Sequence, residues 1–313
     1  MTIGNSKSEA ALVELGVYLK RAGYCFTTVS PATHSRVNAR KGNEWADDLH
    51  GIFGWSRPFE VSVVSKEVYE LMQRAGVVTR DGTRCRSLVR ASTIDDQLFF
   101  HSAYPTEERD SVFFGPDTYR FVAAVGQHLA GSSGAVHRAV DVGCGAGPGA
   151  ISISRFRPHA EVLAVDINPK AIWFAQVNAK LAGAGKVQPQ LGSLLDNVDG
   201  TFDLIVANPP YLVDPDRRAY RHGDGELGEG LSLAIIDCAL QRLGPGGTLL
   251  LYTGVAMVHG RDPFRAAAER KLRDAQMQWE YRELDPDIFG EELDHAAYSE
   301  VDRIAAVLLV AKK

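Results

Sequence analysis

Residues 202–211 read Phe-Asp-Leu-Ile-Val-Ala-Asn-Pro-Pro-Tyr, an apolar run that ends in a polar, proline-rich tetrapeptide. The run over 202–207 is typical of a buried parallel strand. The two prolines have no backbone N–H and a fixed φ, so the strand cannot continue through them. They therefore hold Asn208 rigidly at the carboxyl end of the strand, the edge at which open α/β sheets bind ligands.

The tetrapeptide offers two acceptors for a planar NH₂ group. The Asn208 side-chain oxygen and the Pro209 carbonyl can each accept one hydrogen, which turns the nitrogen lone pair toward an electrophile. Tyr211 is expected to stack on the planar acceptor group. Taken alone, the motif is equally compatible with an ordinary strand exit whose Asn forms a turn and whose tyrosine is a wall residue.

A second motif lies upstream, at 139–149, and reads Ala-Val-Asp-Val-Gly-Cys-Gly-Ala-Gly-Pro-Gly. It combines a short strand, a tight glycine turn and the start of a helix. Pro148 stands where the third glycine of a dinucleotide fingerprint would fall. The next apolar run, 162–165, leads to Asp166, whose carboxylate suits the two hydroxyls of a ribose. This βαβ unit is predicted to bind a nucleoside without a pyrophosphate.

Together the two motifs resemble the class I S-adenosylmethionine-dependent methyltransferases, and within them the release-factor glutamine N5-methyltransferases with their Asn-Pro-Pro-Tyr motif. The resemblance runs from about Val112 to the C-terminus. It implies S-adenosylmethionine as cofactor and S-adenosylhomocysteine as product. The catalytic residues it implies are Asn208, Pro209 and Tyr211, and the cofactor-binding residues are Asp141, Gly143, Cys144, Gly145, Gly147, Asp166, Ile167, Ser193, Leu194 and Asn208.

Three other segments bear on the resemblance. Residues 113–118 stand where the glutamine methyltransferases carry a Pro-Glu-Thr entry loop, and residues 223–231 resemble their glycine-rich segment after the catalytic loop. The family's acidic residue at the end of the next strand is replaced, because residues 252–254 read Tyr-Thr-Gly. Ser193 stands where related enzymes often place an acid that bonds the adenine amino group. The segment 214–229 is long, charged and glycine-rich, so it is interpreted as a flap over the acceptor site, with plain surface disorder as the alternative.

Composition restricts the function further. The chain has 313 residues, 45% of them hydrophobic, and a net charge of −5, which disfavours broad binding to phosphate backbones. Apolar runs are too short for a membrane span, and the first residues lack the apolar core of a signal peptide, so a cytoplasmic protein is expected. The four cysteines are scattered without a Cys-x-x-Cys pair, so neither a metal site nor a disulfide framework is indicated.

The N-terminal third has a separate pattern. A helix over 65–76 precedes a hairpin that turns at Asp81-Gly82, an order similar to a winged helix. This hairpin and its flanks carry a run of arginines, which are Arg74, Arg80, Arg84, Arg86 and Arg90. Such a run could contact RNA or an acidic protein, although a solvated surface is the commoner reading. Residues 1–108 are predicted to form an accessory, substrate-recognition domain.

The remainder, residues 109–313, alternates strands and helices. The predicted fold class is therefore α/β, with a doubly wound, mostly parallel, seven-stranded Rossmann-like methyltransferase sheet and a smaller N-terminal α+β domain. Within it, a helix is expected over 231–243, followed by a glycine break at 244–247 and a strand over 248–253. Further strands are expected over 278–284 and 304–311.

The function predicted from these features is transfer of a methyl group to a planar nitrogen, with a glutamine-type amide in a protein, such as a release factor, as acceptor. Two alternatives stay open within the same chemistry, namely an RNA or DNA base amine and a small molecule. A non-catalytic winged-helix binding protein with a cofactor-sensing domain is a third, against which the intact tetrapeptide counts.

Overall fold

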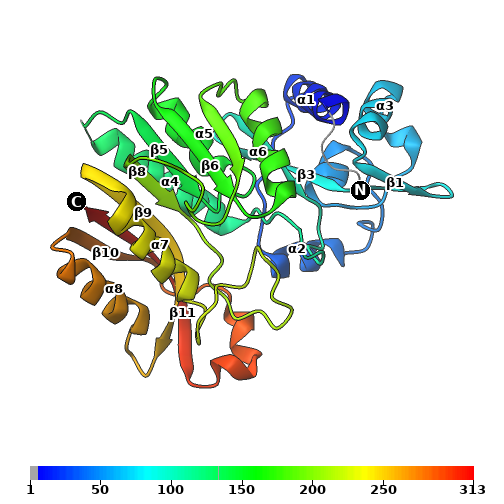
Figure 1. Ribbon diagram of the computed structural model, residues 1–313. Coiled ribbons are helices and arrows are strands. Elements are labelled where there is room, and N and C mark those ends of the chain that lie inside the picture. The colour runs from blue at the N-terminus through cyan, green and yellow to red at the C-terminus, as the bar shows by residue number, and fades with distance from the viewer. Residues whose placement is uncertain (1–5, 133) are drawn as a thin grey trace.

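The computed structural model describes residues 6–132 and 134–313. Its main sheet has seven strands in the order β10-β11-β9-β8-β5-β6-β7 (Figure 1). The strands are β5 (Arg138–Val142), β6 (Glu161–Asp166), β7 (Val187–Leu191), β8 (Phe202–Ala207), β9 (Leu243–Val258), β10 (Gln278–Asp285) and β11 (Val301–Lys312). All run in one direction except β11, which pairs antiparallel with both of its neighbours. The predicted doubly wound, mostly parallel sheet is therefore confirmed.

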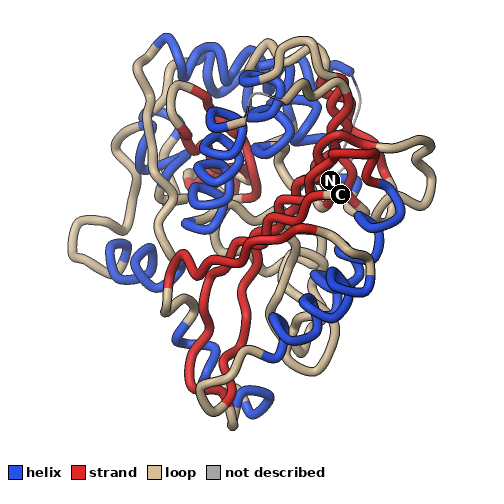
Figure 2. The backbone as a smooth tube through the Cα atoms, turned by 90° about the vertical axis from the view of Figure 1, so that its left-hand side faces the viewer, coloured by secondary structure: helices blue, strands red, loops and turns tan. Residues whose placement is uncertain are grey.

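Helices cover both faces of this twisted sheet (Figure 2). One face carries α4 (Pro116–Gly131), α5 (Pro148–Phe156) and α6 (Pro169–Leu181), and the other carries α7 (Gly230–Arg242) and α8 (Pro263–Asp274). The side chains of β8 alternate between two cores: Leu204 and Val206 belong to the first, and Ile205 to the second. Burial on both faces explains why this strand is an unbroken apolar run in the sequence.

The structure corrects the predicted strand after α7. A strand limited to 248–253 was expected after a glycine break, but β9 spans Leu243–Val258 and includes the glycines. The backbone of this run is paired, since Gly246 N–H donates to the Lys313 carbonyl and Lys313 N–H donates to that of Gly247. A Cβ at Gly247 would lie 2.7 Å from the Phe202 carbonyl oxygen, so glycine here permits close strand approach. Beyond 253 the strand continues because β11 pairs with it as far as Val258.

The N-terminal part is an α+β arrangement, as predicted. It contains α1 (Ser6–Arg21), α2 (Pro31–Asn38), the short helical turns η1 (His50–Gly54) and η2 (Val61–Val63), α3 (Lys66–Ala75), β1 (Val78–Asp81), β2 (Arg84–Ser87), β3 (Val89–Ile94) and β4 (Gln97–Ser102). Strands β1 and β2 form the hairpin predicted around Asp81-Gly82, and β3 pairs with β4. Ser65 caps α3 by accepting from Val68 N–H at 3.2 Å, and Gly76 ends it in a left-handed conformation.

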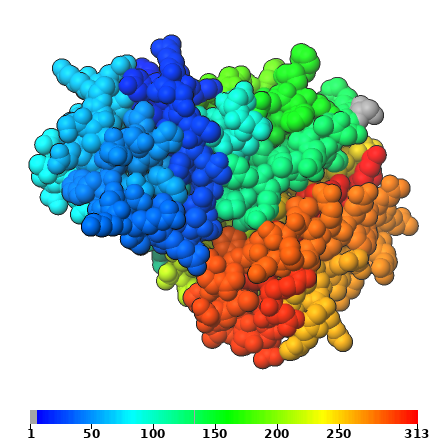
Figure 3. Space-filling model, turned by 180° about the vertical axis from the view of Figure 1, so that it is seen from behind, coloured from blue at the N-terminus to red at the C-terminus, as the bar shows by residue number. Residues whose placement is uncertain are grey.

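This N-terminal part forms a lobe beside the sheet and packs against α6 (Figures 1 and 3). Helix α1 approaches α6 closely at Gly16, where a Cβ would lie 2.6 Å from a methyl group of Leu181 and 3.0 Å from the Phe100 ring. The buried side chains of α1, β4 and α6 belong to one hydrophobic cluster. The packing therefore connects the N-terminal part to the helix that follows β6.

None of the helices in the described residues is long and apolar enough to cross a membrane. Residues 1–5, on which part of the expectation about a signal peptide rested, lie outside the described residues. Residues 103–115 connect β4 to α4, and they contain a cis peptide bond between Tyr104 and Pro105.

Candidate active site

A cavity of about 460 Å³ lies at the carboxyl ends of β5, β6 and β8. It brings together nearly all of the predicted site residues, which are Asp141, Gly143, Cys144, Gly145, Asp166, Ile167, Ser193, Leu194, Asn208, Pro209 and Tyr211. Gly147 is the exception. It begins α5 with φ +85° and lies against α6, where its Cβ would be 3.3 Å from that of Ala175. Its glycine identity thus serves the turn and the helix packing.

The glycine loop depends on backbone conformations that other residues rarely adopt. Gly143 and Gly145 have φ values of +70° and +53°. The Gly143 and Cys144 amides both donate to the Val165 carbonyl, at 2.8 and 3.0 Å, which fastens the loop to β6. Cys144 is buried, and burial raises the pKa of its thiol, so this cysteine is a packing residue rather than a nucleophile.

Asp141 supports the loop from below. It is 1% exposed, and its Oδ2 accepts from the Ala150 backbone N–H at 2.9 Å. Burial raises the pKa of its carboxyl to about 7, with the Ala150 bond opposing that shift. A Cβ at Gly149 would lie 2.6 Å from the same oxygen, so glycine is needed for this contact. The carboxyl group thus anchors the start of α5.

Asp166 occupies the end of β6. Its Oδ2 accepts from Gly145 N–H and its Oδ1 from Asn168 N–H, both at 2.9 Å. Burial raises the pKa of this carboxyl, and the backbone bonds limit the increase. The remaining lone pairs can accept two more donors, such as the hydroxyls of a ribose. Ile167 beside it is 59% exposed on the cavity wall.

These residues fit the nucleoside part of S-adenosylmethionine. The carboxylate of Asp166 can bind the ribose hydroxyls, and the exposed Ile167 and the half-buried Leu194 offer apolar surface for an adenine ring. Ser193 lines the same region and carries a hydroxyl that can bond a ring nitrogen or amino group. The glycines of the loop have positive φ angles and no side chains, so the loop backbone can lie close to the cavity.

The tetrapeptide follows β8 directly and lines the same cavity as the glycine loop, which follows the neighbouring strand β5. Tyr211 is 7% exposed, and its hydroxyl donates to Asp117 Oδ2 at 2.7 Å. Its ring lies against Gly254, where a Cβ would be 2.3 Å from the ring atoms, and it meets the Phe289 ring edge-on at 6.0 Å between centroids. The tyrosine is therefore fixed at its ring and at its hydroxyl.

The segment after the tetrapeptide contributes several residues to one wall of the cavity. Asp214, whose side chain is 1% exposed, accepts from the Arg218 backbone at 2.8 Å and from its guanidinium at 2.5 and 3.0 Å. Burial alone would raise the pKa of the Asp214 carboxyl, but the bonds from Arg218 and the charge of Arg221 hold it below its usual range. The segment is thus folded around a buried ion pair.

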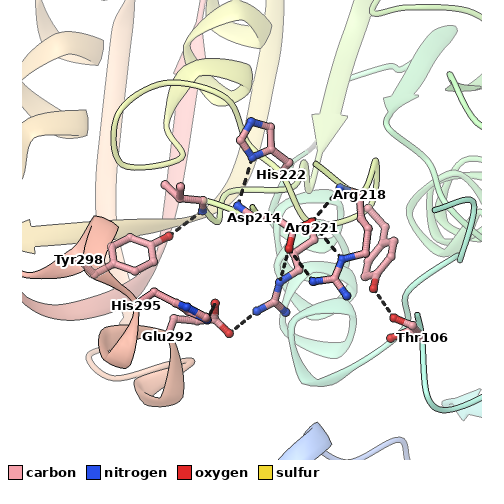
Figure 4. A network of polar contacts seen from close by, with 10 residues as sticks. Thr106, Asp214, Arg218, Arg221, His222, Glu292, His295 and Tyr298 are labelled. Carbon is pink, nitrogen blue, oxygen red and sulfur yellow. Dashed lines mark hydrogen bonds and ion pairs between the residues drawn. The ribbon is translucent and has the colours of Figure 1, made fainter. Parts of the chain in front are cut away.

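Contacts to two other parts of the chain hold this segment in place. Arg221 pairs with Glu292 in the short helix η3 (Gly290–Asp294), and Tyr220 donates to the Thr106 carbonyl ahead of α4 (Figure 4). Tyr298, in the short helix η4 (Ala296–Tyr298), accepts from Val213 N–H at 2.8 Å. The segment therefore lies between η3 and the connection to α4, with several of its residues on the cavity wall.

Sequence reasoning missed several cavity residues as site residues. Those from α4 and the segment before it are Ser111, Val112, Phe113, Asp117, Thr118 and Phe121, and Phe289 comes from the far end of the chain. The similarity of 113–118 to the family's entry loop was a usable signal for Asp117. No comparable signal exists for Phe289, because only the return of the chain between β10 and β11 brings it to Tyr211.

Comparison with known proteins defines the class of domain around this cavity. Residues 125–258 match the family model for the methyltransferase small domain. This part of the chain, which contains the glycine loop, Asp166 and the tetrapeptide, is therefore a methyltransferase domain of the S-adenosylmethionine-dependent class.

The chain resembles the release factor glutamine methyltransferases in particular. It is 39% identical over 165 residues to that enzyme of Deinococcus radiodurans, covering 50% of this chain and 55% of the relative. It is 34% identical over 128 residues to the 4-amino-L-phenylalanine/4-methylamino-L-phenylalanine methyltransferase of Streptomyces pristinaespiralis, covering 37% of this chain and 43% of the relative. The chain thus spans about half the length of the curated relatives it matches.

Among solved structures, the chain is similar to that of aTrm5 in its complex with tRNALeu. The TM-score is 0.50 at 18% sequence identity, and the match covers 80% of this chain and 66% of the other. At that identity the similarity supports the fold alone.

Proposed function

We propose that this chain is an S-adenosylmethionine-dependent N-methyltransferase whose acceptor is a planar amide nitrogen, that of a glutamine side chain in a protein. The observation that carries the proposal is the position of Asn208, which lines the same cavity as Asp166 and the glycine loop. The residues predicted to bind the nucleoside and those predicted to bind the NH₂ group thus line one cavity. The similarity to glutamine methyltransferases over about half the chain agrees with this acceptor.

When bound, S-adenosylmethionine supplies a methyl group made electrophilic by its positively charged sulfur. Asp166, Ile167, Ser193 and Leu194 would hold its nucleoside part, and the glycine loop would lie along it. The protein's own contribution is then to orient the acceptor, which can lower a barrier by about 7–11 kcal/mol in favourable cases.

Asn208 and Pro209 perform that orientation. The Asn208 Oδ1 and the Pro209 carbonyl accept the two hydrogens of the acceptor amide, which directs its nitrogen into the cavity. The same two dipoles stabilise the positive charge that develops on the nitrogen as the new bond forms. A separate general base of raised pKa is not needed before transfer, because the amide nitrogen loses its proton only after it has become more acidic.

Incubation with methyl-labelled cofactor tests this function. Fractions of cell protein, of RNA and of small metabolites are supplied separately, and we expect label in a protein fraction, at glutamine after peptide mapping. Label confined to RNA, or to a small aromatic amine, would overturn the assignment of the acceptor. The small-molecule outcome has its own support, because the Streptomyces relative is named for an aromatic amine and the cavity is lined by Phe113, Tyr220 and Phe289.

A further inference from the structure

One buried carboxylate connects the catalytic tetrapeptide to three other elements of the domain. Asp117, in the first turn of α4, is 3% exposed. Its Oδ2 accepts from the Tyr211 hydroxyl at 2.7 Å, and its Oδ1 accepts from the Tyr252 hydroxyl of β9 at 2.5 Å. Oδ1 also lies 3.1 Å from Arg120, which in turn pairs with Asp285 of β10 at 2.6 Å.

The contacts of Asp117 are charge-assisted and nearly complete. A buried carboxylate is tolerated only when its oxygens are hydrogen-bonded and its charge is balanced, and here two phenols and one guanidinium satisfy both conditions. Its place at the N-terminal end of a sixteen-residue helix also favours a negative charge. The group therefore has a fixed geometry that a solvent-exposed acid would lack.

Tyr211 has no other hydrogen-bond partner in the described residues that holds its hydroxyl. Its ring is already confined by Gly254 and Phe289. The bond to Asp117 therefore fixes the position of the hydroxyl end of the side chain. Tyr211 follows Pro209 and Pro210, whose φ angles are fixed, so a displacement of the tyrosine is transmitted to the Pro209 carbonyl and Asn208.

We propose that Asp117 is a positioning residue for methyl transfer, which acts through the Tyr211 hydroxyl to set the place of the Asn208 and Pro209 acceptor atoms. The inference rests on the proposed function, because those atoms matter only if they bind the acceptor. It goes beyond that function in naming a residue that need not touch the acceptor itself. Tyr252 and Arg120 also bond to Asp117, and no hydrogen bond among the described residues joins either of them to the tetrapeptide.

Two matched variants separate positioning from general stability. Asp117→Asn keeps the shape of the side chain but removes the charge and one acceptor facing the phenols. Tyr252→Phe removes the other phenol from the same carboxylate and leaves the bond to Tyr211 in place. Both variants lose a buried hydrogen bond, so both should lower the thermal midpoint.

We expect Asp117→Asn to lower kcat about 100-fold, the scale for a misplacement of about 1 Å. The KM and the affinity for S-adenosylhomocysteine should stay within about threefold of the wild type. Tyr252→Phe should retain kcat within about threefold.

A double variant shows whether the effect passes through Tyr211. In the Tyr211→Phe background, Asp117→Asn should lower kcat by less than about threefold further, because the connecting hydroxyl is already absent. Equal losses of kcat in Asp117→Asn and Tyr252→Phe, or full additivity with Tyr211→Phe, would overturn the proposal.

A measurement without an acceptor keeps this inference distinct from the function. In protein with ¹³C-labelled tyrosine rings, the Tyr211 signal, identified with Tyr211→Phe, reports its ionisation at alkaline pH. Burial and the charge of Asp117 raise the pKa of Tyr211, so in Asp117→Asn its ionisation should begin at a lower pH. An unchanged titration would contradict the contact itself. Failure of the wild type to methylate any protein while this titration shifts would refute the proposed function alone.

Discussion

The side-chain amide of Asn178 pairs with the backbone of Phe100 through two hydrogen bonds. Phe100 N–H donates to Asn178 Oδ1 at 2.8 Å, and Asn178 Nδ2 donates to the Phe100 carbonyl at 2.9 Å. The same Nδ2 donates to the carbonyl of Ala146 in the glycine loop at 2.8 Å. Asn178 is fully buried in α6. Its side chain therefore satisfies the backbone N–H and carbonyl of Phe100 in β4 and also fixes the loop that lines the cavity.

Replacement of Asn178 should therefore affect stability and cofactor binding together. In Asn178→Ala, three backbone groups lose their partner in a buried place, and each unsatisfied group costs about 1–3 kcal/mol. We expect a clearly lower thermal midpoint and weaker S-adenosylhomocysteine binding by calorimetry at a temperature where the variant is folded. Asn197→Ala, an exposed position outside the cavity lining, serves as the control and should change neither. Wild-type affinity in folded Asn178→Ala would show that the loop does not depend on this contact.

Asp166 should dominate recognition of the nucleoside. Asp166→Ala removes the carboxylate that faces the cavity, and S-adenosylhomocysteine binding should weaken by about 1.5–3 kcal/mol, the scale for hydrogen bonds to a charged group. Calorimetry on the purified proteins measures the affinity for S-adenosylhomocysteine. Asp199→Ala, at an exposed position, removes the same charge and serves as the control. Tight binding of NAD without binding of S-adenosylhomocysteine would refute the cofactor assignment.

Asn208 should contribute to chemistry and little to folding. In Asn208→Ala the thermal midpoint should stay within a few degrees and cofactor binding should be largely kept, while turnover falls by about 10²-fold or more, as on deletion of one preorganised dipole. Thermal unfolding, calorimetry and the rate with the authentic acceptor give the three quantities. Undiminished turnover would rule out the proposed NH₂ site.

Asp141 should make stability depend on pH. Burial raises its pKa in the folded protein from the ordinary value of 3.8 to about 7, so its contribution to stability is complete below 3.8 and is lost as the pH rises through about 7. Relative to Asp141→Asn, which cannot ionise, the wild type should therefore lose up to about 4 kcal/mol between pH 4 and pH 8. Denaturant unfolding of both proteins across that range measures the difference, and parallel curves would contradict it.

Salt dependence separates a protein acceptor from RNA. Arg80, Arg84 and Arg86 are exposed on the β1–β2 hairpin, and none of them lines the cavity. For a protein acceptor we expect affinity to change little between about 50 and about 200 mM salt. A steep loss that flattens in an Arg84→Ala, Arg86→Ala double variant, by about one slope unit per arginine, would favour RNA. The pair Arg270→Ala, Arg273→Ala, on α8, is the control with the same change in charge.

Local patterns in the sequence were sufficient to predict the sheet and to single out two motifs that the structure brings to one cavity. The run before Asn208 places apolar side chains on both faces of the strand. Such a strand must be covered by helices on each side. Glycines that need a positive φ and prolines without an N–H mark where strands must end. These constraints act within a few residues, so they can be read without knowledge of the rest of the chain.

Only the tertiary structure decided which distant residues complete the site. Asp117 precedes Tyr211 by many residues, and Phe289 comes from the opposite end of the domain, so their contacts depend on the order of the strands in the sheet. The limits of β9 depended likewise on its pairing with β11, which overrode the local tendency of glycine and proline to end a strand. Such contacts arise from packing between elements, and the free energy of that packing is not encoded in any single segment.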